Sequence, residues 1–187
     1  CTRAELEKED MLLIYGAGAL GSSILKIAHT ICDHIIVADI MDDKLAEAKQ
    51  NGASYTINVA TENFQEKVLE YTKGRGATVS IDAACVKNSL LLLLQATGNA
   101  GRVITMGFST AATEVNQFLI TSKELDVRGS RLQNKMFGKA IEMIEKGTLD
   151  LNHSISHTFP LTKAQEAFDF VDSRDPSIRK IVFTFDF

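Results

Sequence analysis

The stretch MLLIYGAGALGSSILKIA, residues 11–28, joins an apolar run to a glycine-rich turn and then to a helical pattern. The apolar residues predict a buried strand, and three glycines follow in a Gly-x-Gly-x-x-Gly spacing: Gly16, Gly18 and Gly21. In a strand–turn–helix unit the first glycine permits a sharp turn with positive φ, the second lets phosphate approach the backbone, and the third lets helix and strand pack closely. The spacing alone also fits a plain tight turn, so its meaning depends on the surrounding sequence.

Short apolar runs alternate with helical patterns along the chain as far as residue 130. We expect six strands, with helices between them, at residues 12–15, 34–38, 54–58, 78–82, 102–107 and 125–130. The runs are continuously apolar, which is typical of strands buried on both faces, and intervening helices favour parallel crossovers. The sequence therefore predicts an α/β Rossmann fold, a doubly wound six-stranded parallel sheet.

Asp39 ends the second expected strand, 18 residues beyond Gly21. A carboxylate at this spacing accepts hydrogen bonds from an adenosine ribose in dinucleotide-binding folds. At ~4 Å it would repel a 2′-phosphate by about 4 kcal/mol at an effective dielectric constant of ~20. The backbone N–H groups of Ala19 and Leu20 would meet the diphosphate at the helix N-terminus. The complete unit predicts a site for NAD rather than NADP; the alternative is that Asp39 merely caps the next helix.

Beyond residue 130 the pattern changes to two helices and two extended segments, at residues 134–147, 162–173, 155–161 and 178–185. Thr162 is expected to be the N-cap of the second of these helices, because a hydroxyl suits that position. We therefore expect two parts, a Rossmann NAD-binding domain over 1–130 and a C-terminal helix–strand appendage over 131–187.

The composition excludes several classes of function. With 45% hydrophobic and 24% charged residues, the 187-residue chain is typical of a globular protein. Its net charge of −4 offers no basic surface for nucleic acid or an anionic membrane. The longest apolar run, at residues 90–94, is far shorter than the roughly 20 residues of a membrane span. No signal-peptide pattern opens the sequence, so we expect a cytoplasmic protein.

The three cysteines, Cys1, Cys32 and Cys85, form no CxxC pair, which argues against a disulfide framework and against a metal site held by this chain alone. Cys85 is expected to be an inert thiol, because no neighbour in the sequence would lower its pKa. The chain begins at Cys1 rather than Met, so we expect it to be a piece of a longer protein.

The order of the motifs resembles that of the medium-chain, zinc-dependent alcohol and polyol dehydrogenases. The stretches that carry the resemblance are YGAGALGS (15–22), VADIMDDKLAEAKQNGAS (37–54), SIDAAC (80–85), GRVITMGF (101–108), KELDVRGS (123–130) and SIRKIVFTF (177–185). Within this superfamily the chain is most similar to the starvation-sensing-protein branch, which is akin to sugar-acid dehydrogenases such as galactonate 5-dehydrogenase.

The resemblance implies further residues at the adenosine and diphosphate end of a cofactor. Lys44, five residues after Asp39, would lie beside the adenosine ribose, although it can equally be a solvated helix residue. Ala83 and Ala84 would line the cofactor cleft. Either Arg179 or the adjacent Lys180 would bind the pyrophosphate, and the sequence leaves both open.

The resemblance also implies residues along the nicotinamide. Met106, Gly107 and Phe108 would follow its ring and carboxamide, and Ser130 and Arg131 would lie where the chain leaves the cofactor domain. The alternative for Met106 and Phe108 is that both are ordinary core residues.

In this superfamily a zinc ion polarises the substrate oxygen while hydride passes to the nicotinamide. Its ligands lie in an N-terminal domain, but only 15 residues precede Gly16 here and none matches. The resemblance therefore implies the cofactor-binding part of an NAD-dependent, zinc-assisted dehydrogenase of a secondary alcohol, a polyol or sugar acid. We expect this chain to bind NAD(H) without turnover, with zinc ligands and catalytic residues elsewhere in the longer protein and residues 131–187 returning to the absent catalytic domain.

Two further expectations concern assembly and an alternative function. The resemblance implies a homo-oligomer, a dimer or tetramer, in which the edge strand at 125–130 joins a second copy. The alternative function is a non-catalytic NAD-sensing module, which would share the glycine motif and Asp39. The strand at 102–107 and the C-terminal segments count against it, because a sensor needs neither.

Overall fold

The computed structural model describes residues 1–108, 110–131, 135–151, 154–173 and 175–185. It divides into two compact units, Cys1–Lys135 and Met136–Phe187, which are described separately.

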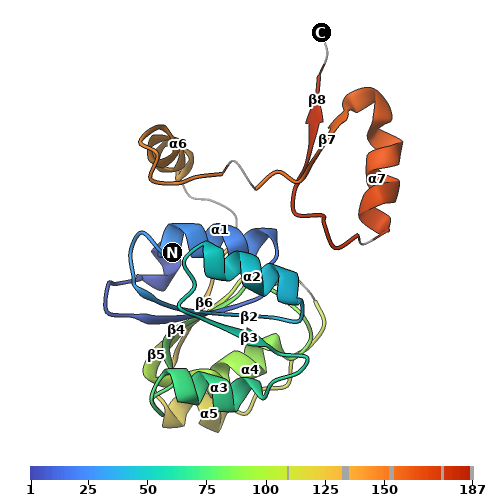
Figure 1. The fold of residues 1–187 in the computed structure, drawn as a ribbon. Helices are drawn as coiled ribbons and strands as arrows, with labels where there is room; N and C mark the ends of the chain where they lie inside the picture. The colour runs from blue at the N-terminus through green and yellow to red at the C-terminus, as the bar shows by residue number, and fades with distance from the viewer. Residues whose placement is uncertain (109, 132–134, 152–153, 174, 186–187) are drawn as a thin grey trace. The chain divides into compact units, whose positions relative to one another are not determined.

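In the first unit, six parallel strands of the described chain form one sheet with the order β3-β2-β1-β4-β5-β6 (Figure 1). The strands are β1 (Met11–Tyr15), β2 (His34–Asp39), β3 (Tyr55–Asn58), β4 (Ala77–Asp82), β5 (Thr97–Thr105) and β6 (Asp126–Gly129). This is the doubly wound order, in which the connections leave β1 toward opposite sides and create a crevice at the carboxyl ends of β1 and β4. The prediction of a six-stranded parallel Rossmann sheet is confirmed.

Five helices of the described first unit cover the two faces of the sheet (Figure 1). Helices α1 (Ala19–Ala28) and α2 (Asp42–Gln50) lie on one face; α3 (Phe64–Tyr71), α4 (Ser89–Ala96) and α5 (Gln117–Ser122) lie on the other. The strand β1 explains why the apolar runs do not alternate: Leu12 and Ile14 belong to the core under α1 and α2, whereas Leu13 belongs to the core under α3 and α4. Both faces are buried, so every position must be apolar.

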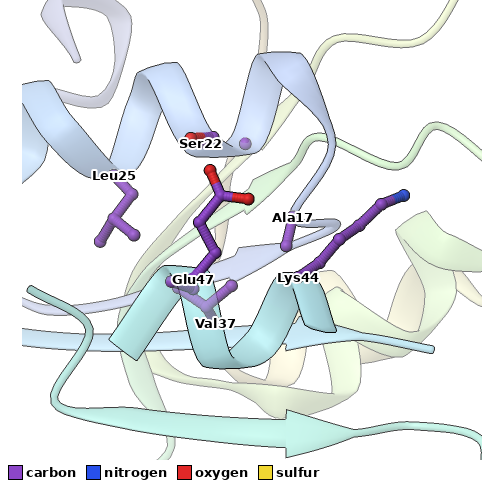
Figure 2. A pocket seen from close by; sticks show the side chains of 8 residues that line it. Ala17, Ser22, Leu25, Val37, Lys44 and Glu47 are labelled. Carbon is purple, nitrogen blue, oxygen red and sulfur yellow. The ribbon is translucent and has the colours of Figure 1, made fainter. Parts of the chain in front are cut away.

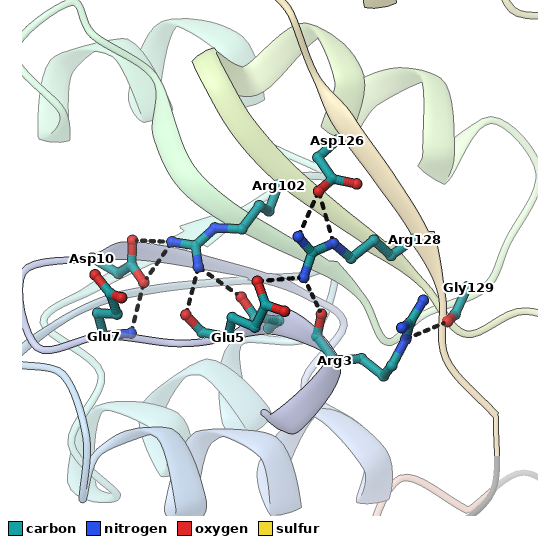
Figure 3. Close-up of polar contacts among 9 residues, drawn as sticks. Arg3, Glu5, Glu7, Asp10, Arg102, Asp126, Arg128 and Gly129 are labelled. Carbon is teal, nitrogen blue, oxygen red and sulfur yellow. Dashed lines mark hydrogen bonds and ion pairs between the residues drawn. The ribbon is translucent and has the colours of Figure 1, made fainter.

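The segment that precedes β1 is held to the sheet by two arginines (Figure 3). The Arg102 guanidinium, on β5, donates to both carboxylate oxygens of Asp10 at 2.7 and 2.9 Å and to the carbonyl of Ala4 at 2.9 Å. Arg128, on β6, pairs with Glu5 at 2.7 Å and with Asp126. This charged segment, which carries the short 3-10 helix Thr2–Ala4, is therefore an ordered part of the first unit.

The second unit contains α6 (Phe137–Glu145), β7 (His157–Pro160), the 3-10 helix Leu161–Lys163, α7 (Ala164–Asp172) and β8 (Ile181–Thr184). Strands β7 and β8 are parallel, with His157 opposite Ile181, and α7 connects them. Thr162 is not the N-cap of α7: it lies within the 3-10 turn, and the N-cap position is Lys163. The expected helix begins at residue 162, but α7 begins two residues later, at Ala164, after a tight 3-10 turn.

No helix in the described part of the chain has both the length and the apolar character needed to cross a bilayer.

Cys32 provides a test of the packing under α1. Its side chain is 0% exposed, and burial raises the pKa of its thiol from 9.0 to about 11. Since the folded-state pKa lies above the unfolded one, the contribution to stability is complete below pH 9 and is lost as the pH rises toward 11. The free energy of unfolding of the unmutated chain should therefore fall as the pH rises from 8 to 10.5. In Cys32→Ala this fall should be smaller by about 1–2 kcal/mol, as measured by urea denaturation at each pH. Identical losses would contradict the buried thiol.

Candidate functional site

The turn between β1 and α1, residues 16–18, requires glycine at Gly16 because of its own packing. Gly16 has a φ of +105°, and a Cβ placed on it would lie 2.7 Å from the backbone nitrogen of Ala84. A Cβ on Gly21 would lie 1.8 Å from the carbonyl oxygen of Gly16, closer than any real contact. The first turn of α1 thus lies directly against the glycine turn, and the turn lies directly against the residues that follow β4.

Gly18 is different, because the packing of the protein gives no reason for a glycine there. Its φ is −68°, and a Cβ placed on it would meet none of the described heavy atoms within 4 Å. Gly18 is the N-cap of α1, and no side chain of the described residues caps this helix. The N–H groups of the first helical residues, among them Ala19 and Leu20, have no acceptors inside an α-helix. An open helix N-terminus of this kind accommodates an anion such as phosphate.

Asp39, the last residue of β2, faces the glycine turn. One carboxylate oxygen accepts the N–H of Ala17 at 2.6 Å; the other accepts the N–H groups of Ile40 and Met41 at 2.8 and 3.1 Å. The N-cap of α2 is Met41, so Asp39 does more than cap a helix. Its carboxylate connects the two turns that flank the carboxyl ends of β1 and β2.

A small pocket lies between α1 and α2, and Ala17, which donates to Asp39, is part of its lining (Figure 2). It is lined by Ala17, Gly21, Ser22, Leu25, Val37, Lys44, Glu47 and Ala48. Figure 2 shows Glu47 pointing toward Ser22, whereas Lys44 extends in the direction in which β2 runs. Lys44 therefore contributes to the lining of this pocket, and its suggested place beside an adenosine ribose stays a prediction.

Two more loops of the first unit reach the same edge of the sheet. The N–H groups of Ala83 and Ala84, directly after β4, both donate to the carbonyl of Tyr15 at 2.9 and 2.7 Å. Gly107, in the loop after β5, lies beside Cys85: a Cβ on Gly107 would be 3.5 Å from the Cβ of Cys85. The loops after β1, β4 and β5 are therefore in contact.

Met106 and Phe108 have different environments. Met106 is partly buried and packs against the core under α1 and α2, as the core alternative suggested. Phe108 is 67% exposed, and the guanidinium of Arg131 lies 5.2 Å from the centre of its ring. Phe108 is thus not a core residue. Ser130, which follows β6, is held to the end of β5, because its N–H donates to the carbonyl of Thr105 at 2.9 Å.

Arg179 lies in the second unit. Its backbone N–H donates to the hydroxyl of Ser156 at 2.9 Å, as does that of Lys180 at 3.2 Å, and its guanidinium donates to the carbonyl of Pro176. The suggested contact of Arg179 or Lys180 with a pyrophosphate stays a prediction.

Two features of the site escaped sequence reasoning. Asp82, which ends β4, is only 3% exposed and accepts hydrogen bonds from within the loop that follows it. Exposed apolar side chains flank the crevice, Ile40 after β2 and Val86 after β4. A polar residue at the end of an apolar strand was the available signal for Asp82, but its partners could not be read from the sequence.

Burial and two nearby carboxylates raise the pKa values of two groups at the site. Burial, followed by the charges of Asp82 and Asp39, raises the pKa of Tyr15. Burial and the charge of Asp82 also raise the pKa of the Cys85 thiol, which agrees with an inert rather than nucleophilic cysteine. Among the described residues, no cluster of three His, Cys, Asp or Glu side chains could hold a metal ion.

A family model described as zinc-binding dehydrogenase matches residues 19–146. The starvation-sensing protein RspB of Escherichia coli (strain K12) is 33% identical over 95% of this chain and 52% of its own length. The erythritol/L-threitol dehydrogenase of Mycolicibacterium smegmatis is 31% identical over 95% of this chain and 49% of its own length. The chain therefore spans about half the length of the curated relatives it matches.

Among solved structures, an alcohol dehydrogenase (rspB) from E. coli CFT073 in complex with the cofactor NADH is similar to this chain. Its TM-score is 0.92 and its sequence identity 32%, over 98% of this chain and 55% of that one.

The glycine turn can be tested with a matched pair of variants. Gly21→Ala should lower the free energy of unfolding by at least about 2 kcal/mol, because its methyl group would overlap the carbonyl of Gly16. Gly18→Ala should change it by no more than about 1 kcal/mol in either direction, because the position is sterically open and its φ suits alanine. Urea denaturation followed by circular dichroism measures both. Equal effects would contradict the described packing.

Proposed function

The chain belongs to the zinc-binding dehydrogenase family, and from that premise we propose that its first unit binds NAD(H) along the carboxyl edge of the sheet. The observation that carries the proposal is the open N-terminus of α1 at Gly18, next to the carboxylate of Asp39. The NADH complex of the similar alcohol dehydrogenase supports it. When bound, the cofactor supplies hydride acceptance and donation; the chain binds and orients it.

The adenosine half would lie over β1 and β2. The N–H groups of Ala19 and Leu20 would bind the diphosphate. Gly18 would keep the approach clear, while Gly16 and Gly21 let the turn and the helix pack closely. Asp39 would accept hydrogen bonds from the ribose hydroxyls, and the Lys44 ammonium would lie beside the same ribose.

The nicotinamide half would lie over β4, β5 and β6. Ala83 and Ala84 would line the middle of the cleft, followed by Met106, Gly107 and Phe108. Ser130 and Arg131 would complete this end. The Phe108 ring after β5 is exposed, and the Arg131 guanidinium after β6 lies 5.2 Å from its centre, so an aromatic ring and a cation meet at this end. Either Arg179 or the adjacent Lys180 would bind the pyrophosphate.

We propose that the longer protein oxidises a secondary alcohol, a polyol or sugar acid, with zinc. The names of the relatives support this class, since they include erythritol/L-threitol and sorbitol dehydrogenases. Zinc ligands and catalytic groups would come from a catalytic domain outside this chain. Residues 131–187 would return to that domain from the Rossmann domain at 1–130. Alone, this chain would bind cofactor without turnover.

Assembly and location are also proposals. β6 lies at the edge of the described sheet, and its free edge could join that of a second copy. We propose a homo-oligomer and a cytoplasmic protein. Polyol turnover by the longer protein would exclude the alternative of a purely NAD-sensing module.

Cofactor choice tests the proposal. The unmutated 187-residue chain should bind NADH at least about 100-fold more tightly than NADPH, because a 2′-phosphate near Asp39 would be repelled by up to about 4 kcal/mol. Asp39→Asn removes the charge but keeps an acceptor oxygen, so the preference should fall to about tenfold or less. Titration followed by nicotinamide fluorescence measures all four dissociation constants.

Asp33→Asn is the matched control, because it makes the same change in net charge at the opposite, amino end of β2. It should leave the preference unchanged. Equal affinity of the unmutated chain for both cofactors would contradict the proposed role of Asp39. Rapid polyol oxidation by this chain alone would contradict the proposal that the catalytic groups lie outside it.

A further inference from the structure

The loop after β4, residues 83–88, is closed by the buried carboxylate of Asp82. One of its oxygens accepts the backbone N–H of Cys85 at 2.8 Å, and the other accepts the hydroxyl of Ser89 at 2.6 Å. Ser89 is the first residue of α4 and is buried like Asp82. A single side chain thus fixes the loop at two points, at Cys85 within it and at Ser89 where the helix starts.

Cys85 is held in an unusual backbone conformation. Its φ is +54°, in the left-handed region that residues with a Cβ seldom adopt. The thiol also donates to the carbonyl of Asp82, at 3.4 Å between sulfur and oxygen. The hydrogen bond from the Cys85 N–H to the carboxylate therefore compensates a strained conformation, as expected where the surrounding structure overdetermines the backbone.

The strained residue lies where three loops meet. Ala84 forms the wall against which Gly16 packs, at 2.7 Å from the position of a Gly16 Cβ. Cys85 forms the wall against which Gly107 packs, at 3.5 Å from the position of a Gly107 Cβ. A change of the Cys85 conformation would therefore move the β5 loop and the glycine turn apart or together.

We propose that Asp82 is a positioning residue for the cofactor, one that sets the distance between the diphosphate-binding turn and the nicotinamide-binding loop without touching the ligand. The inference rests on the proposed function, because only a ligand that spans both loops is sensitive to their separation. NADH spans them; AMP, which would occupy only the region of Asp39 and the glycine turn, does not.

The chemistry of the pair makes the conservative variant informative. In Asp82→Asn the amide oxygen can accept the Cys85 N–H, and the amide nitrogen can donate to the Ser89 hydroxyl. The Ser89 hydroxyl can in turn donate to the carbonyl of Val86, 2.7 Å away. Every polar group keeps a partner, so the loop should keep its conformation. Asp82→Ala removes both acceptors and releases Cys85.

The experiment compares NADH and AMP binding to the 187-residue chain, by fluorescence and calorimetry. Asp82→Ala should weaken NADH binding about tenfold or more but AMP binding less than about threefold, and Asp82→Asn should stay within about threefold of the unmutated chain for both. Glycine adopts a positive φ without support, so removing Asp82 should matter little once residue 85 is glycine. The double variant Asp82→Ala/Cys85→Gly should therefore bind NADH nearly as tightly as Cys85→Gly alone. Cys85→Val, with Asp82 intact, should reproduce the NADH-selective loss even if Asp82→Ala does not fold.

The outcomes separate the two proposals. If the unmutated chain does not bind NADH, the proposed function fails. If it binds NADH and the alanine variant binds equally well, or loses AMP and NADH affinity in parallel, the positioning role of Asp82 is overturned. The role would also be overturned if the double variant Asp82→Ala/Cys85→Gly bound NADH much more weakly than Cys85→Gly alone. It would be overturned as well if Cys85→Val bound NADH as tightly as the unmutated chain.

Discussion

Helix α1 can begin where it does only because Gly21 has no side chain. The carbonyl of Gly16 occupies the place where a Cβ of residue 21 would be, at 1.8 Å. This contact brings the helix N-terminus directly over the end of β1, and the remainder of the site is arranged around it. Asp39 reaches the N–H of Ala17 because the turn is this tight, and Ala84 lies against Gly16 from the other side. A side chain at Gly16 or Gly21 would push apart the N-terminus of α1, the carboxylate of Asp39 and the backbone of Ala84.

The sheet could be read from the sequence because burial on both faces leaves a plain signal. Leu12, Leu13 and Ile14 are completely buried and alternate between two cores, so the strand is apolar throughout. The glycine turn was also readable, because its spacing depends on local geometry. Thr162 was misread because a 3-10 turn and a helix N-terminus have the same local preferences.

Side-chain contacts that form only in the folded chain could not be read in this way. Asp82 and Ser89 are both polar residues in apolar surroundings, and only the folded chain brings the carboxylate to the hydroxyl. Arg102 and Asp10 are 92 residues apart: each is an ordinary charge in the sequence, yet together they hold the segment before β1 against β5. The exposure of Phe108 was similarly undetermined, because an aromatic residue after a strand suits either a core or a binding surface.

The central position of β1 has a consequence for biosynthesis. One of its neighbours, β2, follows soon after it, but Leu12 on the other side pairs with Val79 of β4. As the chain emerges from a ribosome, one edge of β1 stays open after β2 has been made, until α2, β3, α3 and β4 have followed. During that interval the nascent sheet exposes unpaired backbone groups, and a chaperone that shields extended apolar segments would favour the correct pairing over association with other chains.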